Sequence, residues 1–190
     1  MTEWEKSQSG KPHVYNDEMG KMHKEAKKLY QEYNKTTDED EVHREEILSK
    51  LLKKKGKNVW IEPTLHCEFG SNITIGNDVF INCNCILMDN TEIVIGDNVL
   101  FGPNVCLYTA NHAFDPVERA NAICLNKPIH IGNRVWLSGD VKVVGGVKIG
   151  DDSIIGAGSV VIHDIPSGVI AAGNPCRVIR EITEKDKTGC

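Results

Sequence analysis

The sequence predicts an all-β solenoid of short strands, preceded by a charged helical segment. One observation is a six-residue period of aliphatic side chains, which runs through most of the chain after Val59 and fits neither a helix nor an alternating strand. The other is a change in charge density near Gly56. Residues 1–57 carry 13 basic and 12 acidic side chains, whereas the longer stretch 58–181 carries only 7 and 13. We therefore expect different structures on the two sides of that glycine.

The segment before Gly56 is expected to be helical. Apolar residues between Asp17 and Asn34 recur at the spacing of one helix face. Thr36 and Glu39 form the pattern of a capping box, which predicts the start of a second helix. The lysine run 53–55 predicts its end, because cations stabilise the C-terminal end of a helix dipole. Three histidines of this segment are expected to be solvated: His13, His23 and His43.

The hexads predict stacked coils, each burying one aliphatic side chain per repeat. Their corners read IGND, IGDN, IGNR and IGDD, and Gly, Asn and Asp tolerate the dihedral angles of tight corners. Burial of a Val, Ile or Leu side chain contributes about 1.5–3 kcal/mol, so the stack alone can stabilise a solenoid. The expected inward positions are Ile75, Ile81, Leu87, Ile95, Phe101, Leu107, Ile131, Leu137, Val143, Ile149, Ile155 and Val161.

One segment interrupts this period between Leu107 and Ile131. The polar stretch TANHAFDPVERANAICLNKP contains no hexad, and long excursions from a compact solenoid are usually functional. We expect an excursion loop over residues 108–128. It contains His112, and a histidine, with an ordinary pKa near 6.5, suits general-base catalysis.

Composition excludes several classes of function. The net charge is −5 over 190 residues, which argues against a nucleic-acid partner. No apolar run reaches the roughly 18 residues that span a bilayer, and MTEWEKSQSGK has no signal-peptide core. We expect a cytoplasmic protein without membrane contact. Its seven cysteines show no CxxC pair or zinc-type spacing, so we expect small buried hydrophobes and no metal.

Further segments narrow the interpretation: FGSNITIG, NCNCILMDN, IGDNVLFGPNVCLYTANH, KPIHIGNRVW, IIGAGSVV and AAGNPCRVIREI. They resemble the hexapeptide-repeat acyltransferase family, in its maltose/galactoside O-acetyltransferase branch, and HVYNDE resembles that branch's substrate-covering helical segment. The resemblance runs from about Val14 to Ile182. It implies a left-handed parallel β-helix over residues 58–182, an N-terminal helical segment over 1–57 and a C-terminal tail over 183–190.

The resemblance also implies an activity. These enzymes move an acetyl group from acetyl-CoA, a co-substrate, to a hydroxyl of a sugar such as maltose, glucose or a galactoside. A sugar hydroxyl is a poor nucleophile at neutral pH, so a base must accept its proton. In LYTANHAFD, His112 matches the family's catalytic base. The family forms homotrimers with active sites between subunits, and we expect the same here.

Cofactor-binding residues are implied along the coil. Asn82 matches a contact to acetyl-CoA, although a corner asparagine can also serve its local backbone. Gly139 matches a residue whose amide faces the thioester carbonyl, and Ala157 a small residue beside the pantetheine arm. Arg177 and Arg180, in PCRVIREI, match a basic pair near the CoA phosphates. A structural salt bridge is the alternative for Arg180.

The acceptor pocket is implied to include Asp17, Glu68 and Asn90. The chain departs from the family near the cofactor, because Ile162 and His163 stand where relatives commonly carry a hydroxyl and a lysine associated with CoA. Loss of a charged hydrogen bond worth about 1.5–3 kcal/mol would weaken CoA binding.

A second departure is Cys124, where many relatives place a glutamate that orients the catalytic histidine. Three alternatives stay open. A metal-dependent hydratase of the same fold would need three converging histidines, and His112, His130 and His163 show no paired spacing; we expect His130 to face outward. A non-catalytic β-helix scaffold would bind no acetyl-CoA. The acceptor could also be an antibiotic, a lipo-oligosaccharide or an amino acid.

Overall fold

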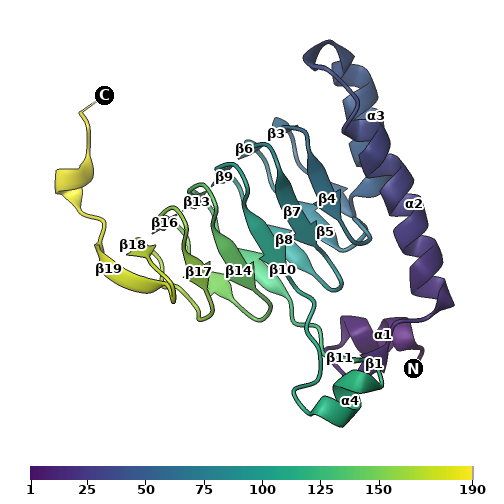
Figure 1. The fold of residues 1–190 in the computed structure, drawn as a ribbon. Coiled ribbons are helices and arrows are strands. Elements are labelled where there is room, and N and C mark those ends of the chain that lie inside the picture. The colour runs from purple at the N-terminus through teal and green to yellow at the C-terminus, as the bar shows by residue number, and fades with distance from the viewer. Residues whose placement is uncertain (190) are drawn as a thin grey trace.

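The computed structural model describes residues 1–189, most of which wind into a parallel β-helix (Figure 1). Each coil contributes one short strand to each of three sheets, and strands of successive coils pair in parallel. The expected β-helix with helices at its N-terminus is confirmed. The first sheet contains β2 (Lys54–Lys55), β5 (Ile73–Ile75), β8 (Ile93–Ile95), β12 (Ile129–Ile131) and β15 (Lys148–Ile149).

The other two sheets complete the prism. The second sheet ends in an antiparallel pair formed by its last two strands. It contains β3 (Val59–Ile61), β6 (Val79–Ile81), β9 (Leu100–Phe101), β13 (Trp136–Leu137), β16 (Ile154–Ile155), β18 (Val169–Ala172) and β19 (Arg177–Glu181). The third contains β4 (Leu65–Cys67), β7 (Cys85–Met88), β10 (Cys106–Tyr108), β14 (Lys142–Val144) and β17 (Val160–Val161).

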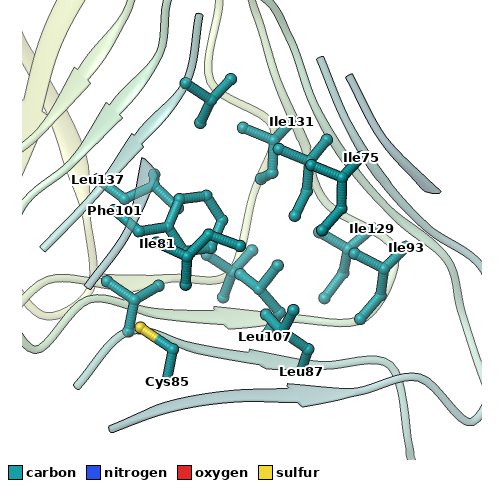
Figure 2. Packing of buried hydrophobic residues seen from close by; sticks show 14 of the residues in the cluster. Ile75, Ile81, Cys85, Leu87, Ile93, Phe101, Leu107, Ile129, Ile131 and Leu137 are labelled. Atoms are coloured by element: carbon teal, nitrogen blue, oxygen red, sulfur yellow. The ribbon is translucent and has the colours of Figure 1, made fainter. Parts of the chain in front are cut away.

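The core consists of ladders of aliphatic side chains in register from coil to coil (Figure 2). All twelve inward positions expected from the hexads are buried. Ile75 lies opposite Ile95, and Ile95 opposite Ile131. In the second sheet Ile81, Phe101 and Leu137 stack in the same way. The six-residue period therefore corresponds to one buried aromatic or aliphatic side chain, or rung, per strand.

The corners divide their conformational requirements between two residues. In each tetrapeptide the fourth residue takes the left-handed conformation, as at Asn98 (φ 57°) and Arg134 (φ 54°). The second residue must be glycine for a different reason, because successive coils approach each other closely at this position. A Cβ on Gly96 would lie 2.7 Å from the backbone oxygen of Gly132, a distance that real Cβ atoms do not show.

Helices close the N-terminal end of the core (Figure 1). They are α1 (Glu3–Gln8), α2 (Asp17–Tyr33), a short 3-10 turn (Asp38–Asp40) and α3 (Glu41–Leu51). The Asn16 side chain caps α2 through the Met19 amide at 3.0 Å. Tyr33, Ile47 and Leu51 are buried against the first coil.

Two local expectations for this segment were wrong by small displacements. The capping box is formed by Thr37 and Asp40 instead of Thr36 and Glu39; Thr36 accepts a hydrogen bond from Arg44 Nε at 2.8 Å. The lysine run does not end a helix, because Lys54–Lys55 pairs with β5 as the first strand of the solenoid.

The excursion folds back onto the N-terminus instead of remaining an irregular loop. It contains α4 (Pro116–Ala120) and β11 (Ile123–Cys124), and β11 pairs antiparallel with β1 (His13–Val14). Figure 1 shows α1, β1, β11 and α4 gathered at one corner of the molecule. This pairing corrects the expectation for His13, which is buried at 4% exposure. The C-terminal tail holds a 3-10 turn (Glu184–Asp186).

The cysteines are distributed largely as expected from their spacing. Four are buried and two are half-buried, all of them free, while Cys190 lies outside the described residues. The buried ones are Cys67, Cys85, Cys106 and Cys176, and the half-buried ones are Cys83 and Cys124.

A buried carboxylate organises the turn that follows β4. Asp89 Oδ1 accepts hydrogen bonds from the amides of Glu68 (2.9 Å) and Phe69 (2.8 Å), and its Oδ2 accepts one from Asn72 (3.1 Å). Burial raises the pKa of Asp89 to about 6, although the backbone donors oppose the shift. The backbone of Glu68 is thereby fixed from inside the solenoid.

The ladder predicts a strong contrast between neighbouring residues of β8. Ile95→Ala should lower the free energy of unfolding by about 2–5 kcal/mol, because it leaves a cavity in the stack. Val94, whose side chain points outward from the same strand, provides the matched control, and Val94→Ala should cost about 1 kcal/mol or less. Urea unfolding of both variants measures the difference. Equal losses would contradict the ladder.

Asp89 predicts a pH-dependent contribution to stability. Its pKa is higher in the folded chain, about 6, than the ordinary aspartate value of 3.8. The stabilising contribution is therefore fully present below pH 3.8 and is lost as pH rises through 6. Relative to Asp89→Asn, the wild-type protein should lose about 2 kcal/mol between pH 4 and pH 7. Urea unfolding at several pH values tests this, and a constant difference would contradict it.

Candidate active site

A cavity of about 370 Å³ lies where the excursion meets the N-terminal segment. Its walls come from α1, β1, the start of α2, the turns after β4 and β7, and residues 110–126 of the excursion. Segments far apart in sequence thus build one concave site. The lining residues are Ser7, His13, Tyr15, Met19, Glu68, Phe69, Asn90, Ala110, Asn111, His112, Ala122, Cys124 and Asn126.

His112 is held at this cavity by backbone pairing. It lies opposite Cys124 in an antiparallel bridge. Hydrogen bonds on either side, from Ala113 to Ile123 (3.0 Å) and from Leu125 to Asn111 (2.9 Å), fix the two segments together. The side chain of His112 is exposed, and its Nδ1 lies 3.7 Å from Cys124 Sγ. The imidazole can therefore meet an incoming molecule.

A buried polar network forms the floor of the cavity. The Asn126 amide nitrogen lies 2.8 Å from Ser7 Oγ and 3.2 Å from His13 Nε2, and Ser7 Oγ donates to the Asn90 carbonyl at 3.0 Å. Asn90 Oδ1 is the one buried side-chain polar atom of residues 1–189 that has no hydrogen-bond partner. An unsatisfied acceptor costs about 1–3 kcal/mol, so a donor that reached this buried oxygen would remove that cost.

Glu68 supplies a carboxylate to the same cavity. Its side chain is 12% exposed and lies 3.5 Å from His23 Nδ1. Burial and the neighbouring Glu68 carboxylate raise the pKa of Tyr15 to about 12, so the phenol stays protonated at neutral pH. Asp17, expected in this pocket, is exposed on the first turn of α2 and does not line the cavity.

The residues expected to bind the cofactor lie on another part of the solenoid. Asn82 follows β6, Gly139 follows β13 and Ala157 follows β16, so all three occupy the corner after the second sheet. Backbone hydrogen bonds keep successive corners in register, including Asn82 to Phe101 (3.2 Å) and Gly158 to Gly139 (2.9 Å). None of these residues lines the His112 cavity.

Asn82, Gly139 and Ala157, called here the corner column, have two chemically relevant features. The Gly139 amide donates no hydrogen bond to any acceptor in residues 1–189, and Ala157 is exposed. The Asn82 Oδ1 accepts from the Cys83 amide at 2.8 Å, which is the local backbone contact foreseen as an alternative. An unpaired amide next to a small exposed residue leaves room for a ligand carbonyl.

The two arginines lie beyond the column on β19. Arg177 is exposed and donates to the Cys176 carbonyl at 2.9 Å. Arg180 forms a bidentate pair with Asp186 at 2.8 and 2.6 Å, and this pair lowers the pKa of Asp186 well below its ordinary range. The alternative expected for Arg180, a structural salt bridge, is thus present. Ile162 and His163 are exposed just after β17.

A larger cavity of about 580 Å³ lies between α3 and β3. Arg44 lines it with its guanidinium carbon 5.7 Å from the centre of the Tyr33 ring and 5.2 Å from that of Trp60. It contains no histidine, cysteine or serine. The cavity at His112 therefore remains the better candidate for catalysis.

Some residues of the site were missed by sequence reasoning. Tyr15 lies in the segment HVYNDE but was given no role, and Asn126 and Ser7 carried no motif. Their only signal is three-dimensional, because the pairing of β1 with β11 brings them together. The same pairing turns His13 from an expected surface residue into part of the floor. As expected, His130 points outward, 3.3 Å from Glu92.

No helix in residues 1–189 is long and apolar enough to cross a membrane. That same part of the chain contains no cluster of three or more histidine, cysteine, aspartate or glutamate side chains able to hold a metal ion.

Comparison with protein-family models gives two matches along the chain. Residues 6–56 match the maltose acetyltransferase hexapeptide capping motif, and residues 128–163 match the bacterial transferase hexapeptide, six repeats. The galactoside O-acetyltransferase of Escherichia coli K12 is 44% identical over 162 residues, covering 85% of this chain and 80% of its own.

Solved structures agree with these matches. A maltose O-acetyltransferase from Clostridium difficile 630 superposes with a TM-score of 0.95 at 43% identity, covering 97% of this chain and 99% of its own. A galactoside acetyltransferase in complex with coenzyme A gives 0.94 at 39% identity, covering 98% and 94%. The β-helix is the left-handed one of these proteins, and the chain belongs to the hexapeptide-repeat acyltransferase family, in its maltose/galactoside O-acetyltransferase branch.

Proposed function

We propose that this protein transfers the acetyl group of acetyl-CoA to a hydroxyl of a sugar, with His112 as the general base. The observation that carries the proposal is the exposed imidazole at a cavity that also contains an unpartnered Asn90 oxygen and the Glu68 carboxylate. Its volume of about 370 Å³ lies within the range for small-molecule sites. Homologous structures with bound coenzyme A support the choice of co-substrate.

The proposed reaction requires His112 to accept one proton and then to return it. As the acceptor hydroxyl attacks the thioester carbon, its proton passes to an imidazole nitrogen and a new C–O bond forms. The C–S bond then breaks, and the departing CoA thiolate recovers the proton from the imidazolium. The imidazole is neutral again at the end, so no further co-reactant is needed.

Acceptor recognition rests on oxygens that accept hydrogen bonds. Asn90 Oδ1 has no partner in residues 1–189, and the Glu68 carboxylate lines the same wall. Sugar hydroxyls are donors that satisfy such groups. Asp17 lies at the start of α2 close in sequence to Tyr15 and Met19 of the lining, and we assign it an outer contact to the acceptor.

Acetyl-CoA would lie along the corner column. The free Gly139 amide suits the thioester oxygen, where a donor stabilises developing negative charge. Asn82 and Ala157 flank that position, and Arg177 and Arg180 suit the CoA phosphates. Ile162 and His163 follow β17 of the third sheet, at a different corner, and supply no lysine to the cofactor.

The separation of the two halves supports a homotrimer with active sites between subunits. His112 and the corner column lie at different corners of the prism, so a neighbouring copy must bring the second half. The second sheet also presents an outward apolar row, in which Leu100 is 50% and Trp136 47% exposed. Exposed apolar patches of this kind mark interfaces. The row consists of Trp60, Phe80, Leu100, Trp136, Ile154 and Ile170.

Replacement of the base tests the reaction. His112→Ala should reduce kcat for acetyl transfer about 10²- to 10⁴-fold while leaving the dissociation constant of acetyl-CoA unchanged. The matched control is His130→Ala, because His130 points outward and pairs with Glu92. Mass spectrometry of a mixed sugar panel measures the product and avoids thiol reagents. Full activity of His112→Ala would contradict the assignment, and absence of acetyl-CoA binding would favour a scaffold.

Mixing of variants tests the shared site. His112→Ala removes the base and Ala157→Trp blocks the cofactor groove, so each alone should be inactive. Co-expressed with different tags and doubly purified, mixed assemblies should regain activity, because some interfaces join an intact half from each chain. Light scattering should give about three times the chain mass of 21.1 kDa. A monomer, or mixtures without activity, would contradict the shared site.

A further inference from the structure

Cys124 faces two histidines across the small sheet of the excursion. It lies directly opposite His13 of β1 on one side and opposite His112 on the other. Residues directly opposite in antiparallel strands place their side chains on the same face. The thiol therefore lies on the same face of the sheet as both imidazoles, and each ring nitrogen needs a partner to define its tautomer.

His13 is already fully paired. Its Nδ1 lies 3.0 Å from the Lys11 carbonyl oxygen, and a carbonyl only accepts, so Nδ1 carries the proton. Nε2 is then the acceptor for the Asn126 amide at 3.2 Å. With both nitrogens occupied and the ring buried, His13 has no lone pair to offer a substrate.

The tautomer of His112 depends on its contact with the Cys124 thiol, as that of His13 depends on its own partners. Cys124 Sγ lies 3.5 Å from the Ala122 carbonyl oxygen, which can only accept, so the thiol has an acceptor for its proton there. The sulfur lone pairs are left for His112 Nδ1 at 3.7 Å. Burial raises the pKa of the Cys124 thiol, so the group is protonated at neutral pH.

We propose that Cys124 is the positioning residue that holds His112 in the Nδ1–H tautomer, leaving Nε2 free to accept the acceptor's proton. The role of Nε2 rests on the function proposed above; the tautomer itself does not. A neutral thiol orients the ring without adding charge beside it. It does so more weakly than an ionised partner would, since charged hydrogen bonds are about twice as strong.

Other polar groups around His112 are engaged elsewhere. In the excursion, Asp115 accepts from the Val117 and Glu118 amides, and Arg119 donates to the Ala113 and Phe114 carbonyls.

Across the cavity lie Glu68, Tyr15 and His13. Within residues 1–189, Cys124 is the one side chain in hydrogen-bond contact with the His112 ring. Its removal should therefore release the ring.

The direct test is nuclear magnetic resonance of the wild-type protein with 15N-labelled histidine. His112 is assigned by comparison with His112→Gln. We expect a protonated Nδ1 and an unprotonated Nε2 at pH 8. A protonated Nε2 in the wild-type protein would overturn the proposal. This measurement needs neither catalysis nor a folded cysteine variant, so its failure is distinct from failure of the proposed function, which His112→Ala tests.

Kinetics provide the second test. Cys124→Ala should lower kcat about three- to tenfold with an unchanged KM for acetyl-CoA, and its spectrum should show mixed tautomers. Cys124→Ser should restore most of kcat, because a hydroxyl can donate to Ala122 and accept from Nδ1. Cys124→Glu should move the acid limb of the kcat/KM profile upward by about one pH unit.

The matched control is Cys106→Ala. Cys106 is buried, and its Sγ donates to the Asn104 carbonyl at 3.4 Å, away from both histidines. This variant should leave the pH profile and the tautomer of His112 unchanged. Cys124→Ala with wild-type kcat and tautomer, or a profile equally altered in Cys106→Ala, would overturn the positioning role.

Discussion

The register between successive coils is the constraint on which the rest of the structure depends. Backbone hydrogen bonds such as Gly96 to Ile131 (2.9 Å) and Gly132 to Ile149 (2.8 Å) bring the coils so close that these corners accept only glycine. Register keeps each aliphatic rung above the last and repeats every corner at the same place. An insertion can therefore leave the solenoid only at a corner, and the excursion leaves after β10.

The register between coils explains which parts of the molecule are fixed in geometry and which can vary in sequence. The corner column of Asn82, Gly139 and Ala157 is built from the repeat itself, so its spacing is fixed by the coils. The His112 cavity combines the turns after β4 and β7 with two non-repeating segments that pair through β1 and β11. Residues on the pairing segments can thus vary while the column stays constant, because the column is part of the coils.

Sequence patterns predicted the features that are local or periodic. The twelve rungs follow from a period that each strand repeats, and His112 follows from its place in the longest break of that period together with the family resemblance. Patterns failed where a distant partner decides the outcome. The lysine run predicts the end of a helix, but Lys54–Lys55 pairs with β5 as a strand. The charged segment around His13 predicts a solvated side chain, but β1 pairs with β11 and His13 is buried. No local signal distinguishes these cases, because the pairing partner of Lys54–Lys55 lies 20 positions away and that of His13 lies 111 positions away.

The polarity of the His112 cavity is set by the protonation of the groups that line it. His13 presents no lone pair, Cys124 is neutral, and Glu68 supplies the carboxylate among the lining residues. With Asn90 Oδ1 unpartnered, the walls offer acceptors on one side and a proton-accepting imidazole on the other. An anionic molecule would meet the Glu68 carboxylate and leave Asn90 Oδ1 without a donor. Under the proposed function, a neutral polyol would donate hydroxyl protons to both oxygens and present a further hydroxyl to His112, so charge and hydrogen-bond capacity would favour it together.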